Sequence, residues 1–426
     1  MIEKFDIPKL DKVELLDKLS NIRLPNEFKD NSSIGWKCGT PSWAVQEMVR
    51  AWKEGFNWEE KRKEMSQWHH YKTTINELNI HFIHEVSSKT TDAIPIILLH
   101  GWPSSFYEFH KIIEPLRDGI NSTQSFHVVI PSLPGYGFSE APKTDGSGSI
   151  AQIANILHKL MIKLGYQKYM IYGTDWGATI GTFMAQNFSN SCLGFITNMP
   201  IAMPPLPTLY NIIFHPIKVI LFIISLFLGF DLVYGKGKTK RLKTTAYANV
   251  DKDETAGYRA IQGTRPYTLA FGLTDSPIGL LAWMLEPYHQ WTYFPSSSHQ
   301  LVLPATVSVD EFLTQVTIYW ISNCMSSSYR IYYEVKKNHN KALKDMMKTY
   351  VSVPMAVSYF ENEVVKLPRD WIEVSSHLVQ FKSYDKGGHF PALEVPSLLI
   401  EDIQKFGSYI VNKNSIQQEQ KMKKLL

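Results

Sequence analysis

One short segment near the middle of the chain constrains its fold more than any other, the pentapeptide Gly-Thr-Asp-Trp-Gly at 173–177. An apolar run at 169–172 precedes it, and residues 178–184 have the composition of a helix start. Glycines on both sides of a central polar residue permit a tight turn from a strand into a helix, and such a turn projects the middle side chain, Asp175. On its own the pattern is short, and an ordinary aspartate in a turn would explain it equally well.

A second strand and its loop stand about seventy residues earlier. The apolar run at 94–99 is typical of a buried parallel strand, and it leads into His-Gly-Trp-Pro at 100–103. In α/β-hydrolases such a loop supplies one N–H group of an oxyanion hole, and the residue after the nucleophile supplies the other. The two donors would then be the backbone N–H groups of Trp102 and Trp176.

The aspartate changes the chemistry of this turn, because α/β-hydrolases commonly place a serine there. A carboxylate at Asp175 attacks a saturated carbon, either of an epoxide or of an alkyl halide, and leaves an alkyl ester on the enzyme. Hydrolysis of that ester then needs a general base that activates water.

The base is predicted to be His389. It lies in a Lys-Gly-Gly-His-Phe loop at 386–390, after the strand expected at 378–384, and such a loop can reach the turn at Asp175. His100 precedes the oxyanion loop, where a structural hydrogen bond is the more common role. His69 and His70 are placed at the end of a polar N-terminal helix, with no strand end nearby.

A catalytic histidine of this kind needs a carboxylate that fixes its tautomer and stabilises the imidazolium. The segment after the apolar strand at 351–357 offers two, Glu361 and Glu363. Position alone does not separate them.

Together these features resemble the microsomal epoxide hydrolases and the juvenile hormone epoxide hydrolases, and the resemblance runs from about Phe5 to Phe406. The strings that carry it are HGWP at 100–103, PSLPGYGFS at 131–139, GTDWG at 173–177 and GGHFPALEVP at 387–396. The resemblance implies an α/β-hydrolase fold and hydrolysis of epoxides without a metal or an organic cofactor.

The family motifs also imply roles for particular residues. The motif F-x-x-E selects Glu363 as the acid. Two tyrosines of the lid would donate to the epoxide oxygen and bind substrate with Trp102 and Trp176. One is Tyr258, in a Gly-Tyr pair, and R-x-Y-x-E selects Tyr332 as the other, although the adjacent Tyr333 leaves this choice open by one residue.

The order of segments predicts one mostly parallel sheet with helices on both faces. Residues 1–90 form an N-terminal extension, with helices expected at 10–19, 42–53 and 58–69, that wraps the core in the resembled family. The core is split into 91–200 and 341–412, the mainly helical lid is inserted at 201–340, and 413–426 is a polar tail.

Twelve uncharged residues at 219–230 form the most apolar stretch of the lid. A membrane-spanning helix needs about 20 apolar residues, so a buried lid helix is the favoured interpretation. Contact with one face of a bilayer is the alternative, and it would suit a lipophilic substrate.

Composition limits the classes of partner and the cellular compartment that we expect for this protein. The chain of 426 residues carries 44 Lys and Arg against 40 Asp and Glu, so its net charge of +4 is near neutral for this length. It has no basic aromatic patch of the kind that binds nucleic acid. Three widely spaced cysteines suit a reducing compartment, and the start of the chain does not read as a signal peptide or anchor, so a cytoplasmic protein is expected. The oligomeric state is open.

The predicted function is two-step hydrolysis of lipophilic epoxides. A haloalkane dehalogenase would use the same Asp175, His389 and acid, and is the first alternative. A non-catalytic protein that binds lipophilic ligands is the second, although each position expected to be catalytic is occupied by a suitable residue.

Overall fold

The computed structural model describes residues 1–28, 35–88, 93–120, 124–235, 254–295, 301–338 and 340–425. Within these residues nine strands form one sheet, in the order β1-β2-β3-β5-β4-β6-β7-β8-β9. The strands are β1 (Ile2–Lys4), β2 (His70–Ile75), β3 (Leu78–Glu85), β4 (Ile94–Leu99), β5 (Phe126–Pro131), β6 (Tyr169–Gly173), β7 (Cys192–Thr197), β8 (Val351–Tyr359) and β9 (Ser376–Ser383).

The strands from β5 to β9 in this order pair in parallel, whereas β1, β2 and β3 form an antiparallel edge. β4 is central, and five of its six residues are buried. Its apolar run therefore has the form expected of a parallel strand that is covered on both faces. The mostly parallel sheet predicted from the sequence is confirmed.

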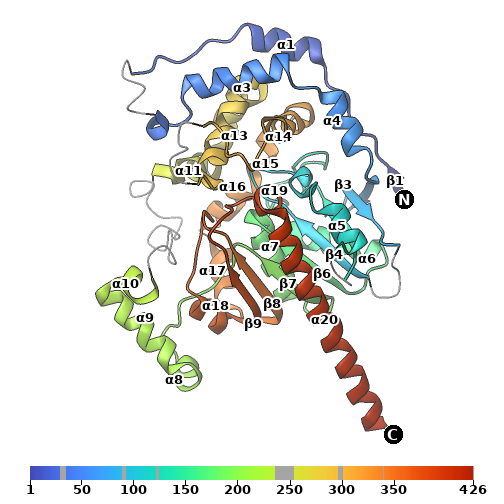
Figure 1. Ribbon diagram of the computed structural model, residues 1–426, viewed down its shortest axis with the longest axis vertical. Coiled ribbons are helices and arrows are strands. Elements are labelled where there is room, and N and C mark those ends of the chain that lie inside the picture. Colours follow the sequence, from blue (N-terminus) through green and yellow to red (C-terminus); the bar gives the residue numbers. More distant parts are fainter. Residues whose placement is uncertain are drawn as a thin grey trace.

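Helices alternate with the parallel strands, except between Thr197 and Val351, where helices follow one another without a strand (Figure 1). They are α1 (Lys12–Ser20), α3 (Ser42–Glu54), α4 (Trp58–Met65), α5 (Ile113–Asp118), α6 (Ile150–Lys163), α7 (Asp175–Asn187), α8 (Leu209–Phe214), α9 (Pro216–Leu228), α10 (Phe230–Tyr234), α11 (Gly257–Thr264), α12 (Pro266–Asp275), α13 (Pro277–Trp291), α14 (Val309–Ser322), α15 (Met325–Ser328), α16 (Arg330–Lys337), α17 (Lys341–Lys348), α18 (Arg369–Ser375), α19 (Pro391–Glu394) and α20 (Pro396–Leu425).

Two long helices cover opposite faces of the sheet, as adjacent positions on β7 demonstrate. A Cβ atom added at Gly194 would lie 2.7 Å from the ring of Phe406 in α20. The ring of the next residue, Phe195, lies 2.7 Å from a Cβ atom added at Gly181 in α7. Successive side chains of a strand point to opposite faces, so α7 and α20 pack on opposite sides.

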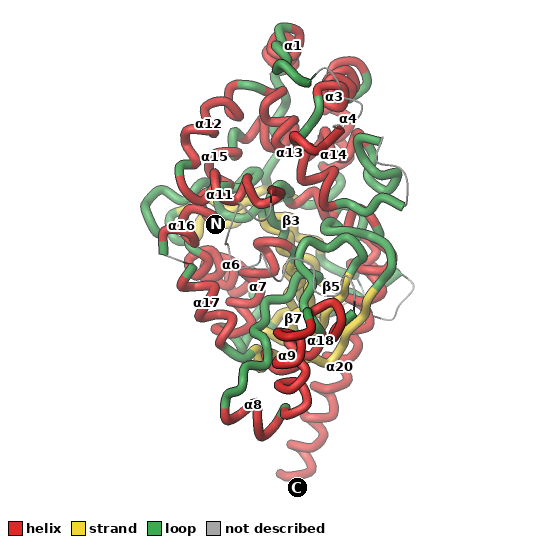
Figure 2. Tube along the Cα trace, turned by 90° about the vertical axis from the view of Figure 1, so that its left-hand side faces the viewer, coloured by secondary structure: helices red, strands yellow, loops and turns green. Residues whose placement is uncertain are grey.

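The lid helices α11 to α16 lie over one end of the sheet, and α1, α3 and α4 wrap around their outer side (Figures 1 and 2). Trp58 of α4 connects two parts of the N-terminal extension, because its indole N–H donates to the carbonyl of Pro8 at 3.0 Å. The extension also contacts the lid, because the hydroxyl of Thr40 donates to the carbonyl of Ala282 in α13 at 2.9 Å.

The extension also differs from its expected form. The third helix ends at Met65 instead of His69, and residues 70–85 form the hairpin of β2 and β3. This hairpin was missed, and the placement of His69 and His70 in a helix was wrong. The sequence of β2 contains Tyr, two Thr and Ile, which favour a strand, and β3 joins the sheet by pairing with β5.

The expectation of a buried lid helix at 219–230 is also wrong. In α9 only one narrow stripe, Val219, Phe222 and Ser225, is buried. Exposed large apolar side chains cover the rest of α8, α9 and α10, and they are Leu209, Tyr210, Ile212, Ile213, Phe214, Ile217, Ile220, Ile223, Ile224, Leu226, Phe227, Leu228 and Leu232. Figure 1 shows these three helices at the end of the molecule opposite α1 and α3, away from the lid helices.

The polar tail expected at 413–426 is continuous with α20, which extends as far as Leu425 (Figure 1). In the described part of the chain, no single helix is both long enough and apolar enough to cross a membrane. Helices α12 and α13 reach that length and composition only as a pair, and they meet at a bend of 117°.

Candidate active site

The turn between β6 and α7 holds Asp175 in a strained conformation. Asp175 has a φ angle of 49°, in the left-handed region, which costs on the order of 1–3 kcal/mol for a residue other than glycine. The neighbouring glycines permit the turn sterically. A Cβ atom at Gly173 would lie 2.3 Å from the carbonyl oxygen of Gly177, and one at Gly177 would lie 2.0 Å from that of Leu99.

The loop after β4 approaches the same carboxylate. A Cβ atom at Gly101 would lie 2.1 Å from Oδ1 of Asp175, so only glycine permits this approach. The backbone N–H of Trp102 donates to Oδ1 at 2.9 Å. The N–H of Trp176 belongs to the first turn of α7, whose N–H groups have no acceptor inside the helix. Within the described residues it makes no hydrogen bond to Asp175.

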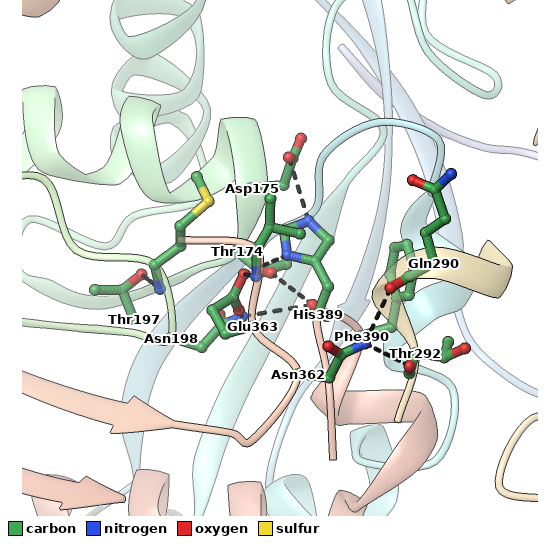
Figure 3. A network of polar contacts seen from close by, with 12 residues as sticks. Thr174, Asp175, Thr197, Asn198, Gln290, Thr292, Asn362, Glu363, His389 and Phe390 are labelled. Carbon is green, nitrogen blue, oxygen red and sulfur yellow. Dashed lines mark hydrogen bonds and ion pairs between the residues drawn. The ribbon is translucent and has the colours of Figure 1, made fainter. Parts of the chain in front are cut away.

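His389 lies between two carboxylates (Figure 3). Its Nε2 is 3.3 Å from Oδ2 of Asp175, and its Nδ1 is 2.6 Å from Oε1 of Glu363. Burial alone would lower the pKa of His389, but the charges and hydrogen bonds of Glu363 and Asp175 outweigh burial and raise it to about 10. The imidazole is therefore held as a cation while Asp175 is ionised.

The two carboxylates that sequence position could not separate lie in different environments. Glu363 is fully buried, and besides His389 it accepts hydrogen bonds from the N–H of Val364 at 2.6 Å and the side-chain amide of Asn198 at 2.5 Å. Glu361 is exposed and pairs with Lys366 at 3.4 Å. Of the two, Glu363 is the one that contacts the histidine.

Two lid tyrosines meet the oxyanion loop in an aromatic cluster. The ring of Tyr258, on α11, stacks on Trp102 with centroids 5.2 Å apart. The ring of Tyr332, on α16, lies 4.8 Å from Trp176 and 6.0 Å from Tyr258. Burial raises the pKa of Tyr332 well above its usual value, so its hydroxyl keeps its proton. Tyr333 instead lies beside Lys337, with the ammonium 5.9 Å from its ring.

The other candidate histidines lie apart from this arrangement. His100 is buried under the oxyanion loop, where its Nε2 accepts from the N–H of Leu133 at 3.2 Å, and burial lowers its pKa to about 4. His69 contacts Glu85, and His70 contacts His81. All three make structural contacts, and none of these contacts involves Asp175.

Asn198 is directly involved as well, although it was not predicted from the sequence. It follows β7 immediately, and its side chain links Glu363 to the hydroxyl of Tyr172, which donates to it at 3.2 Å. Catalytic and ligand-binding side chains in open α/β sheets gather at the carboxyl ends of the strands. An asparagine directly after a buried strand was therefore a usable signal.

The arrangement combines a carboxylate nucleophile, a histidine–glutamate pair and hydrogen-bond donors around one point. It suits attack on a saturated carbon followed by hydrolysis of an ester. Within the described ranges, no group of three or more His, Cys, Asp or Glu side chains is arranged to hold a metal ion.

Comparison with known proteins agrees with this chemistry. Residues 3–109 match the family model described as the epoxide hydrolase N terminus, and residues 94–214 match the α/β hydrolase fold. The chain is 34% identical to epoxide hydrolase 1 of Sus scrofa over 415 residues, which cover 92% of this chain and 85% of the relative. It is 33% identical to the juvenile hormone epoxide hydrolase of Bombyx mori over 379 residues, covering 87% and 79%.

Solved structures give the same result. The crystal structure of juvenile hormone epoxide hydrolase from the silkworm Bombyx mori has a TM-score of 0.83 at 29% identity, covering 97% of this chain and 96% of that one. Aspergillus niger epoxide hydrolase has a TM-score of 0.77 at 27% identity, covering 96% and 97%. The resemblance inferred from the four sequence strings is confirmed, and the chain belongs to the epoxide hydrolase family of α/β hydrolases.

Proposed function

We propose that the protein hydrolyses lipophilic epoxides to vicinal diols through an ester on Asp175. The observation that carries this proposal is the position of Asp175, which lies between the N–H of Trp102 and the His389–Glu363 pair. An aspartate in this position can form an ester that a histidine-activated water then hydrolyses.

In the first step Asp175 attacks one carbon of the epoxide and breaks its bond to oxygen. The hydroxyls of Tyr258 and Tyr332 donate to the oxygen as negative charge develops on it. Such donors act mainly in the transition state, where that charge is largest. The aromatic cluster around Trp102 and Trp176 provides an apolar surface for the rest of the substrate.

In the second step His389 removes a proton from water, and the water attacks the carbonyl carbon of the ester. The backbone N–H groups of Trp102 and Trp176 stabilise the tetrahedral oxyanion. Formation of the ester has already removed the charge of Asp175, which helps to raise the pKa of His389. The pKa of His389 therefore falls when the ester forms, so the imidazolium can release its proton to solvent and leave the neutral imidazole that accepts a proton from water, while Glu363 continues to orient it.

Haloalkane dehalogenation is the competing reaction, because it would use the same nucleophile and base. The two tyrosines disfavour it, since a departing halide is a weak base and gains little from a phenolic hydrogen bond. Turnover of styrene oxide and of an alkyl bromide, with diol and bromide both quantified, separates the two activities. Bromide release that exceeds diol formation would reverse the assignment.

The ester itself is tested by turnover in oxygen-18 water. Water attacks the carbonyl carbon of Asp175, so repeated cycles should place the label in the peptide that contains Asp175. Label that enters the diol and never the protein would contradict the covalent route, because water would then attack the epoxide directly.

We also propose that helices α8 to α10 contact a lipid surface. Helices α8 and α9 contain no acidic residue, and their one lysine, Lys218, forms an ion pair with Glu373 of α18, while α10 contains Asp231. Five Lys and Arg residues follow in the sequence at 236–243, outside the described residues. Apolar helices that are followed in the sequence by several cationic residues are typical of segments that bind the interface of an anionic bilayer.

Sedimentation with vesicles tests this contact. The protein should pellet with vesicles that contain phosphatidylserine and remain in solution with buffer alone, whereas equal recovery in both supernatants would contradict it. Cytoplasmic location with peripheral association is proposed on the same basis. The free cysteines Cys38, Cys192 and Cys324 fit a reducing compartment.

A further inference from the structure

The end of lid helix α13 is in direct contact with the loop that carries His389, which we call the base loop. The backbone N–H of His389 donates to the carbonyl of Trp291, the last residue of α13, at 2.9 Å. A Cβ atom at Gly388 would lie 2.3 Å from the same carbonyl oxygen. The base loop therefore has no room to shift toward α13, and a movement of α13 would displace the loop.

The acid loop is attached to the same place by Asn362, the residue before Glu363 (Figure 3). Its side-chain amide donates to the carbonyl of Gln290 at 3.0 Å and to that of Thr292 at 2.6 Å. Its backbone N–H donates to the carbonyl of Gly387, in the base loop, at 2.9 Å. One side chain thus connects the acid loop to the last turn of α13, while its backbone connects the two catalytic loops.

Glu394 makes a third connection. This buried carboxylate accepts from the N–H of Tyr293 at 2.7 Å and from the N–H of Phe390 at 3.2 Å. Burial raises the pKa of Glu394 to about 8, although the backbone N–H groups oppose that change. It therefore joins the chain just beyond α13 to the residue that follows His389.

The other side of the same segment faces the aromatic cluster. The ring of Trp291 lies 5.3 Å from that of Tyr258, 6.4 Å from that of Trp102 and 5.2 Å from the imidazole of His389. Residues Gln290–Tyr293 thus contact the aromatic cluster through a side chain and both catalytic loops through the backbone.

We propose that Asn362 and Glu394 are positioning residues for the His389–Glu363 pair, acting through Gln290–Tyr293. Substrate that packs against Trp291 would then set where the base stands relative to the ester on Asp175. The inference rests on the proposed two-step reaction and deepens it. Neither residue contacts the reacting atoms, so the ester should form normally while its hydrolysis depends on both.

A purely structural role is the competing explanation. The last carbonyls of a helix lack partners inside it, and Asn362 could serve only to satisfy those of α13. Loss of Asn362 would then lower stability and slow both half-reactions together. The two roles therefore differ in how the loss divides between ester formation and ester hydrolysis.

The test uses rapid mixing of the full-length protein with styrene oxide, and follows the ester by quenched intact mass. Asn362→Ala and Glu394→Gln should leave the rate of ester formation within about twofold. Displacement of the base by about 1 Å costs roughly 10²-fold in rate, so ester hydrolysis should slow by about 10- to 100-fold. The ester should then accumulate during steady-state turnover. Asn362→Ser replaces Asn362→Ala if the alanine variant does not fold.

Two controls match the changes in residue type. Glu361→Gln alters the neighbouring exposed carboxylate, and Asn187→Ala removes an asparagine that donates to a backbone carbonyl, that of Phe183 at 2.9 Å, on the nucleophile helix. Neither control should accumulate ester. Equal slowing of both half-reactions in the test variants, or hydrolysis at the parent rate, would overturn the positioning role. A parent protein that never forms an ester would instead contradict the proposed function.

Discussion

β4 and α9 are both nearly uncharged apolar segments, yet in the folded protein β4 is buried and most of α9 is exposed to solvent. In β4, Ile96 to Leu99 are 0% exposed between neighbouring parallel strands. In α9, Ile220 is 54% exposed and Phe227 is 83% exposed. Apolar composition indicates that a segment favours leaving water, but the surface that removes it from water is not encoded in the segment itself. For β4 that surface is the sheet, and for α9 we propose a lipid surface.

The two regions also differ in how tightly their polar groups are held. At the end of β4, Gly101 and Trp102 are fixed against Asp175, and Asp175 contacts a buried histidine–glutamate pair. At α9, the polar contact with the core is the ion pair between Lys218 and Glu373. We infer that the region around β4 performs the chemistry, whereas α9 determines where the protein meets its substrates.

The largest effect should come from removing the nucleophile. Asp175→Asn should reduce kcat for styrene oxide by about 10⁴-fold or more, since groups that act as a unit lose nearly all their effect together. Phe227→Ser, in the other region, should leave turnover of this water-soluble substrate unchanged. Steady-state kinetics with circular dichroism checks both. A comparable loss of kcat in the two variants would contradict the assignment of catalysis to the region around β4 alone.

The lid tyrosines should follow in size. Tyr258→Phe and Tyr332→Phe each remove a hydroxyl and keep the ring, and general acid catalysis is typically worth about 10²–10⁴-fold. Each variant should therefore slow ester formation within that range in single-turnover experiments. Tyr333→Phe is the matched control and should be mild, because this ring lies beside Lys337. If Tyr333→Phe were the damaging change, the assignment would move by one residue.

A buried acid near the active site predicts how stability depends on pH. Glu108 is 0% exposed, and burial raises its pKa to about 8, although a hydrogen bond with the side chain of Ser104 opposes that change. Its folded pKa exceeds the ordinary glutamate value of 4.5, so the folded state binds the proton more tightly and loses stability as pH rises from about 4.5 through 8.

Glu108→Gln should remove that pH-dependent loss. Relative to the parent, the variant should gain about 4 kcal/mol of unfolding free energy between pH 5 and pH 9. Urea titrations at the two pH values measure this difference. A difference that did not change with pH would show that Glu108 titrates as it does in the unfolded chain.

The smallest effect should be on binding to membranes. Burial of one large apolar side chain is worth about 1.5–3 kcal/mol, so Phe227→Ser should weaken binding to phosphatidylserine vesicles by at least about 10-fold. Val13→Ser is the matched control, since Val13 is 81% exposed on α1, far from α9 along the chain. Equal weakening by both substitutions would remove α9 as the contact.

Much of the fold and of the candidate site could be predicted from the sequence because the relevant signals are local. The glycines around Asp175 and at 101 fit only a tight turn and a close approach, and the structure has both. The apolar strands predict the parallel sheet. His389 and Glu363 follow strands whose carboxyl ends meet at one edge, and the structure brings them together with Asp175.

The rest depends on contacts between distant segments. The hairpin at 70–85 was missed because it joins the sheet by pairing with β5, and the sequence of the hairpin alone does not indicate that partner. The exposure of α9 depends on which helices happen to cover it. In the sequence, Asn362 and Glu394 have no feature that sets them apart from other polar residues. Their role depends on contacts with Thr292 and Tyr293, just beyond α13, which are distant in the sequence. Position alone could not separate Glu361 from Glu363; the family motif F-x-x-E selected Glu363, and in the structure it is Glu363 that contacts His389.

The most direct test of the aspartyl-ester account is the intact mass of His389→Gln after incubation with styrene oxide. Ring opening needs no base, whereas hydrolysis of the ester does, so the variant should gain the mass of one epoxide. Peptide analysis should then locate the addition at Asp175. An unmodified variant that forms diol at the parent rate, or an addition at another residue, would contradict the account.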